Sequence, residues 1–114
     1  LTMGADPIAS AVLHQAPALG RSFDAFVVRK APKDHGRGKQ VEGPDVEGKR
    51  VVVLEDTSTT GGSPLTAARA LEAAGAIVVA VAVVVDRATD ARRAIEEAGY
   101  EYRAAIGLHD LGLA

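Results

Sequence analysis

The chain has 114 residues, of which 47% are hydrophobic and 25% charged, and its formal net charge is −2. This length suits one small domain with its own core, and the charge gives no reason to expect a nucleic-acid or membrane partner. The absence of cysteine excludes disulfides, thiolate zinc sites and a cysteine nucleophile, and it fits a cytoplasmic protein. The longest apolar run, residues 76–85, is too short to span a bilayer.

The first half of the chain predicts a helix, a short strand and a long loop. Apolar residues at helical spacing indicate a helix over residues 6–19, and the segment 24–28 is typical of a short strand. Gly, Pro and charged residues then take over in residues 29–48, with a hairpin expected around 40–42. Loops of this length are uncommon in compact domains and are usually functional.

The second half alternates strands and helices. Ser63 is a plausible N-cap with Pro64 at the first helical position, and the unbroken apolar run favours a strand buried on both faces. The expected elements are a strand over 49–54, a loop over 57–63, a helix over 64–74, a strand over 76–85, a helix over 89–98 and a strand over 100–106.

This order predicts an α/β fold with a doubly wound, mainly parallel sheet flanked by helices. Residues 1–114 form a single domain in this interpretation, with no repeat or internal boundary. In open α/β sheets, ligands bind beyond the carboxyl ends of the strands. Arg29, the pair Glu55 and Asp56, and the pair Asp86 and Arg87 are all expected at such ends.

The stretch from Val51 to Ser63 is the most informative part of the sequence. An apolar strand ends in two carboxylates, which can accept hydrogen bonds from vicinal hydroxyls, and an isolated acidic pair would more often be merely solvated. A loop rich in Thr, Ser and Gly follows and leads into a helix, whose N-terminus favours an anion. The pattern lacks the lysine of an ATP-binding P-loop and predicts a sugar-phosphate site.

Basic residues gather in the long loop. Seven of the 13 Lys and Arg residues lie between Arg29 and Arg50. A nucleic-acid arm is one explanation, but the loop lacks aromatic stacking residues, and a small polyanion such as pyrophosphate explains the cluster better. The segment Gly4–Pro7 could form a second anion loop, although alone it is more often a simple helix start.

These motifs resemble the type I phosphoribosyltransferases, whose signature is an apolar strand, two acids and a Thr/Gly loop. The stretch FVVRKAPKDHGRGKQVEG resembles the catalytic loop of the orotate phosphoribosyltransferases within that family. The resemblance covers nearly the whole chain. It implies transfer of ribose 5-phosphate from 5-phosphoribosyl 1-diphosphate (PRPP) to orotate, giving orotidine 5′-monophosphate and pyrophosphate in pyrimidine biosynthesis.

The resemblance also implies a role for each matching residue. Glu55 and Asp56 would hold the ribose hydroxyls, and the basic loop would meet the pyrophosphate. Orotate would be contacted by Thr59 and Arg87, and Lys33, His35 and Asp56 would be catalytic. The full set of expected PRPP-binding residues is Arg29, Lys30, Lys33, His35, Glu55, Asp56, Thr57, Ser58, Thr59, Thr60, Gly61, Gly62 and Ser63.

Family resemblance further implies Mg²⁺ held mainly by PRPP oxygens, and a homodimer in which loop residues reach the neighbouring active site. Family members have an N-terminal hood and a first core strand that this sequence lacks, so we expect an N-terminally truncated piece. Two alternatives remain at this point: a phosphoribosyltransferase for another base, and a PRPP-binding regulator without catalysis.

Overall fold

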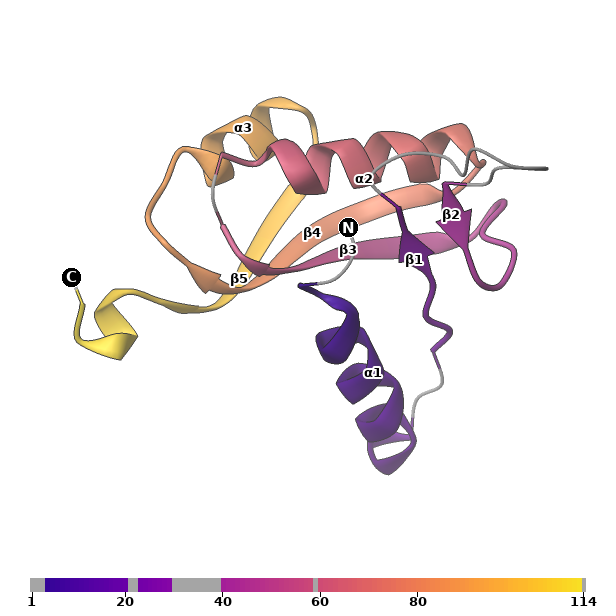
Figure 1. The fold of residues 1–114 in the computed structure, drawn as a ribbon, viewed down its shortest axis with the longest axis horizontal. Coiled ribbons are helices and arrows are strands. Elements are labelled where there is room, and N and C mark those ends of the chain that lie inside the picture. The colour runs from indigo at the N-terminus through magenta and orange to yellow at the C-terminus, as the bar shows by residue number, and fades with distance from the viewer. Residues whose placement is uncertain (1–3, 21–22, 30–39, 59, 114) are drawn as a thin grey trace.

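The computed structural model describes residues 4–20, 23–29, 40–58 and 60–113. Helices and strands follow one another in the expected order (Figure 1). The elements are α1 (Asp6–Gln15), a 3₁₀ helix (Ala16–Leu19), β1 (Val27–Val28), β2 (Val41–Glu42), β3 (Arg50–Thr57), α2 (Gly62–Ala73), β4 (Ile77–Asp86), α3 (Ala91–Glu97), β5 (Glu101–Gly107) and a 3₁₀ turn (His109–Leu111).

The main sheet is parallel, as predicted, with the strand order β3–β4–β5. Val53 lies opposite Val81, and Val81 lies opposite Tyr102. Helices α2 and α3 cover one face of this sheet, and α1 lies on the other side (Figure 1). The prediction of an α/β fold with a mainly parallel sheet flanked by helices is confirmed.

The core lies between the sheet and helices α2 and α3. Leu71 and Ile95 are fully buried there against Val81 and Val83. The other face of β4 is covered less completely than the sequence predicted, since Ile77 keeps 54% of its surface exposed. The reason is that α1 packs against β3 and leaves the lower face of β4 only half-buried by described residues.

The strand predicted over 24–28 is reduced to Val27 and Val28, and it does not join the main sheet. It pairs with Val41 and Glu42 in an antiparallel hairpin, so the hairpin expected around 40–42 is confirmed. The Arg29 N–H donates to the Gln40 carbonyl at 2.7 Å, which closes this pair.

Element boundaries differ from the predictions where the site begins. Strand β3 continues three residues beyond 54, through both acids to Thr57, because the parallel ladder with β4 extends that far. The N-cap of α2 is Gly61 rather than Ser63, which lies in the first helical turn. Gly61 has φ = +89°, a backbone conformation that glycine adopts without strain.

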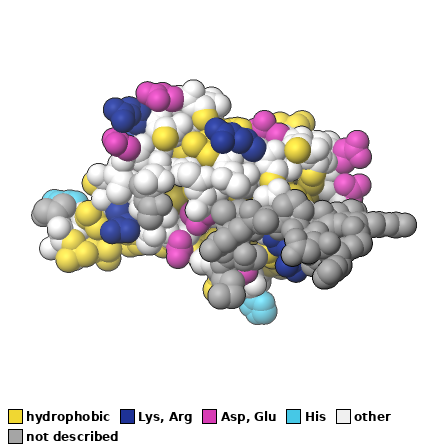
Figure 2. Space-filling view, turned by 45° about the horizontal axis from the view of Figure 1, so that its top comes forward, with side chains coloured by type: hydrophobic (Ala, Val, Ile, Leu, Met, Phe, Trp, Pro, Cys, Tyr) yellow, Lys and Arg dark blue, Asp and Glu magenta, His cyan; other side chains and the backbone are white. Residues whose placement is uncertain are grey.

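Acidic and basic side chains are interspersed on the face of the molecule that Figure 2 shows. Among the described residues, no helix is long and apolar enough to cross a membrane.

Candidate sugar-phosphate site

The two predicted sugar-binding acids lie inside the end of β3 and differ sharply in environment. Successive side chains of a strand point to opposite faces of its sheet. Glu55 is accordingly only 8% exposed, in line with the buried residues of β3, whereas Asp56 is exposed. One carboxylate oxygen of Asp56 accepts the Thr57 N–H at 2.8 Å. Asp56 is therefore the more accessible of the two carboxylates.

Burial gives Glu55 unusual electrostatics. Loss of hydration penalises its charged form and raises its pKa above the ordinary value of 4.5, and the neighbouring charge of Asp56 acts in the same direction. A carboxyl with a shifted pKa beside a loop suited to anions is a typical feature of functional sites.

Gly4 approaches Asp56 very closely. A Cβ atom built on Gly4 would lie 2.7 Å from Oδ2 of Asp56, which is too close for any larger residue without displacing that carboxylate. The segment Gly4–Pro7, which the sequence alone does not distinguish from a simple helix start, therefore borders the acid pair. Its signal was a glycine two residues before a helix start, a pattern that alone is unspecific.

The loop after β3 leads directly into α2. The Thr60 hydroxyl accepts the Gly62 N–H at 3.3 Å, and the first turn of α2 follows at once. Backbone N–H groups of a first helical turn point away from the helix and attract anions. The loop over 57–63 can therefore receive a phosphate group; Thr59 lies outside the described residues.

Hydrogen bonds join the start of this loop to the end of β4. The buried Ser58 hydroxyl donates to Oδ1 of Asp86 at 3.1 Å and accepts the Arg87 N–H at 2.7 Å. The predicted convergence of Glu55, Asp56, Asp86 and Arg87 at the carboxyl ends of neighbouring strands is thus observed.

Arg29 does not take part in this convergence, so the expectation that it lies at the same edge was wrong. It is bound to the β1–β2 hairpin, where its guanidinium pairs with Glu42 at 2.9 Å. Residues Gln40 and Val41 of this hairpin line a hollow with Ala73, near the last turn of α2 and thus at the opposite end of the sheet. Lys30, Lys33 and His35 lie outside the described residues.

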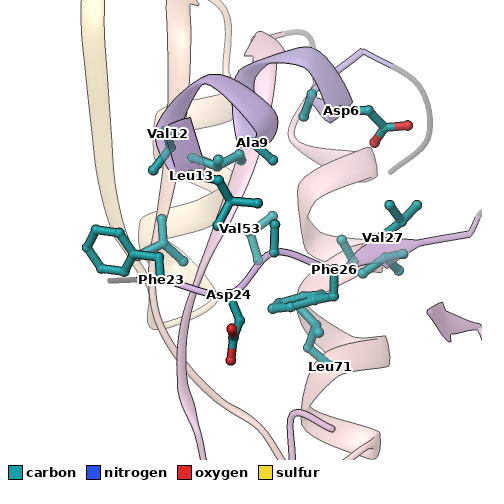
Figure 3. Close-up of a pocket in the computed structure, with 16 residues that line it drawn as sticks. Asp6, Ala9, Val12, Leu13, Phe23, Asp24, Phe26, Val27, Val53 and Leu71 are labelled. Atoms are coloured by element: carbon teal, nitrogen blue, oxygen red, sulfur yellow. The ribbon is translucent and has the colours of Figure 1, made fainter. Parts of the chain in front are cut away.

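A separate pocket lies between α1, the segment 23–28, β3 and α2 (Figure 3). Leu13, Phe23 and Phe26 give it an apolar interior. Asp24 turns outward, where it pairs with Lys49 at 3.4 Å. The charged residues that line this pocket, Asp6 and Asp24, are both acidic and would repel a phosphate, which makes the end of β3 the better candidate.

Comparison with known families agrees with this geometry. The sequence pattern of the "Phosphoribosyl transferase domain" family matches residues 1–100. The chain belongs to the phosphoribosyltransferase family. The resemblance inferred from the acid pair, its loop and the basic segment is thereby confirmed.

The phosphoribosyltransferase relatives include proteins named for orotate. The chain is 62% identical to "Orotate phosphoribosyltransferase" of Tropheryma whipplei over 97% of its length, and 62% identical to that of Streptomyces avermitilis over 99%. It covers 52% and 63% of those two proteins, so it spans little more than half the length of the curated relatives it matches.

Solved phosphoribosyltransferase structures share the fold. A phosphoribosyltransferase from Corynebacterium diphtheriae has a TM-score of 0.88 at 58% identity, covering 98% of this chain and 64% of that one. Orotate phosphoribosyltransferase from Mycobacterium tuberculosis in complex with PRPP has a TM-score of 0.86 at 55% identity, covering 97% of this chain and 61% of that one.

Proposed function

We propose that the protein containing this chain is an orotate phosphoribosyltransferase, a glycosyltransferase that moves a pentosyl group. It would transfer ribose 5-phosphate from PRPP to orotate, release pyrophosphate and supply the pathway to UMP. The observation that carries this proposal is the acid pair and anion loop at the end of β3, joined through Ser58 to Asp86 and Arg87. The names of the most similar relatives support the choice of orotate.

In this proposal the substrate lies across the carboxyl ends of β3 and β4. Asp56, with Glu55, accepts hydrogen bonds from the ribose hydroxyls, and the loop from Thr57 to Ser63 holds the 5′-phosphate through its residues other than the buried Ser58. Arg87 and Thr59 contact orotate. Arg29, Lys30, Lys33 and His35 meet the pyrophosphate.

The chemistry follows from charge. Breaking the bond at C1′ leaves a cationic ribosyl centre and concentrates negative charge on the departing pyrophosphate. Lys33 and His35 would stabilise that leaving group, and the carboxylate of Asp56 would stabilise the ribosyl side. Excluding water from the site would protect the ribosyl centre from hydrolysis.

Magnesium fits the donors available at this site. Mg²⁺ prefers oxygen ligands, and the exposed carboxylate of Asp56 is such a donor. Most of the remaining ligands would be PRPP oxygens. Bound Mg²⁺ would neutralise part of the pyrophosphate charge.

We further propose a cytoplasmic homodimer whose basic loops serve the neighbouring active site. The position of Arg29 supports this arrangement, because the hairpin that carries it lies at the opposite end of the sheet from Asp56 of the same chain. A loop that starts there is better placed to serve another subunit.

The decisive experiment measures loss of orotate absorbance with PRPP and Mg²⁺, using the full-length gene product. We expect turnover that needs all three components and yields one pyrophosphate per orotate consumed. Turnover with adenine or another base in place of orotate would indicate a different phosphoribosyltransferase. PRPP binding without turnover of any base would indicate a regulator instead.

The assignment of Asp56 can be tested by calorimetry. Asp56→Asn should weaken PRPP binding by roughly tenfold to a hundredfold, because a charged acceptor for the ribose hydroxyls is lost. Asp24→Asn is the matched control, since it neutralises an exposed carboxylate that pairs with Lys49 away from the site. Equal PRPP affinity in the Asp56 variant and the control would refute the ribose assignment.

A further inference from the structure

Ser58 ties the loop to β4 by three hydrogen bonds. Its side chain is almost completely buried, with 3% of the residue exposed. Its N–H donates to the Val85 carbonyl at 3.0 Å, which extends the β3–β4 ladder by one residue. Its hydroxyl donates to Asp86 and accepts the N–H of Arg87. The start of the proposed phosphate loop and the proposed base-contacting residue are thus joined through one side chain.

Asp86 fixes the turn that presents Arg87. Its Oδ1 accepts the Ala88 N–H at 3.0 Å as well as the Ser58 hydroxyl. Ala88 has φ = +57°, the only positive value among the described residues other than glycine. An alanine pays a steric cost in this conformation, and it persists only when its surroundings determine it strongly. Arg87 therefore sits in a turn that is held in one shape.

Side chains from helix α3 and strand β5 pack around Asp86. The Arg92 guanidinium lies 3.8 Å from Oδ2 of Asp86 and 4.6 Å from the centre of the Tyr102 ring. Tyr102 is buried, and its hydroxyl has no hydrogen-bond partner in the described part of the chain. Burial raises the pKa of Tyr102, so the phenol stays neutral beside the carboxylate. Asp86 is thus backed by side chains from α3 and β5.

Arg87 itself remains available to a ligand. Its guanidinium forms no ion pair with any residue that the structure describes, in contrast to Arg92 and Arg93 of the following helix. A guanidinium can bind a carboxylate with two parallel hydrogen bonds, and that geometry requires the arginine backbone to be well placed.

We propose that Ser58 and Asp86 are positioning residues that hold Arg87 for recognition of the carboxylate-bearing base. This inference rests on the proposed function. A purely structural role would lower stability and affect both substrates alike. A positioning role would act selectively on the base, because the two hydrogen bonds lost with the Ser58 hydroxyl, to Asp86 and to the Arg87 N–H, both hold the turn that presents Arg87.

The test uses steady-state kinetics of the full-length gene product with each substrate varied in turn. Ser58→Ala should raise KM for orotate by about tenfold and leave KM for PRPP within about twofold, since one buried hydrogen bond and its unsatisfied partner are at stake. Thr89→Ala is the matched control. The Thr89 hydroxyl, like that of Ser58, accepts a backbone N–H, but its donor is Ala91 at 3.3 Å, at the start of α3. This control should leave both constants unchanged.

A double-mutant cycle tests whether Ser58 and Asp86 act on Arg87 together or independently. If Ser58 and Asp86 act together, the variant with both Ser58→Ala and Asp86→Ala should raise KM for orotate no more than the larger single change. Multiplied effects would mean independent roles and would overturn the proposal.

A further variant covers the case in which Ser58→Ala does not fold. Ala88→Gly keeps every side chain of the network and suits the positive φ, but it lets the turn sample other shapes. It should raise KM for orotate by about twofold to fivefold with KM for PRPP unchanged. An unchanged KM for orotate in an active Ala88→Gly enzyme would refute the positioning role alone. Absence of orotate turnover in the unmodified protein would refute the proposed function as well.

Discussion

Among single residues, the two neighbouring acids of β3 illustrate how a strand gives adjacent identical groups different chemistry. Glu55 joins the buried row of β3, whereas Asp56 is exposed beside Gly4. The buried carboxyl has a raised pKa and the exposed one can meet a ligand directly. Their adjacency in the sequence therefore does not make them equivalent.

This difference predicts a change of stability with pH. Because the pKa of Glu55 in the folded protein lies above the ordinary value of 4.5, ionisation favours the unfolded chain, and the free energy of unfolding falls as pH rises through the interval above 4.5. Glu55→Gln should remove that loss and be more stable relative to the unmodified protein at pH 7 than at pH 4, at the expense of PRPP binding. Urea unfolding at both pH values measures this.

The control for this measurement is Glu97→Gln, an exposed carboxyl of α3. It should leave the pH dependence unaltered. If Glu55→Gln is destabilised equally at both pH values, the burial of Glu55 does not act through its charge.

At the level of elements, α2 connects the core to the site. Its first turn receives the loop from β3, and its last turn packs on the sheet through Leu71, which is 1% exposed. The position of the anion loop therefore depends on the packing of a residue far from any ligand.

Leu71→Ala should accordingly lower the free energy of unfolding by about 2–5 kcal/mol, since it leaves a cavity in a fully buried position. Leu113→Ala removes the same atoms from a side chain that is 70% exposed, and it should change stability by less than about 0.5 kcal/mol. Denaturation by urea, followed by circular dichroism, compares the two. Similar losses for both would mean that α2 is not anchored as described.

Periodicity in the sequence was enough to predict every element of the main sheet and all three α-helices. Element ends were harder to predict, because tertiary contacts decide them. Strand β3 extends through the acids since β4 offers partners that far, and the segment 24–26 is not a strand since no strand among the described residues lies beside it. Gly61 is the N-cap of α2 with φ = +89°, whereas the residue types alone favoured Ser63 as the N-cap.

For the whole molecule, the sequence was sufficient to predict that the ends of β3 and β4 meet, but not where the β1–β2 hairpin lies. Parallel strands bring Asp56 and Arg87 to one edge by topology alone, so the sequence order was sufficient. The path of the hairpin that carries Arg29 depends on antiparallel pairing with β2, which no periodic pattern specifies. The buried role of Ser58 was equally hidden, because a serine in such a loop looks like a phosphate ligand.

The proposed shared active site predicts complementation between inactive variants. Lys33→Ala should lower kcat by orders of magnitude through loss of charge on the leaving-group side, and Asp56→Asn should disable the ribose side. If each loop serves the neighbouring subunit, a hybrid dimer contains one intact site. An equimolar mixture that exchanges subunits should therefore regain about a quarter of the unmodified activity, measured as orotate consumption.

The control is a mixture of either variant with itself, which should stay inactive. Absence of recovered activity after demonstrated subunit exchange would place the loop and the acids of one chain in the same site.

The continuation of β3 through Thr57 has a consequence for engineering new substrates. The acids proposed to hold the sugar belong to the scaffold, since their backbone is part of the parallel ladder with β4. The turn over 86–88 lies outside the ladder and is shaped by side chains instead. A library aimed at accepting a different base can therefore keep residues 50–58 constant and vary the turn over 86–88, so that the choice of base changes separately from the binding of ribose.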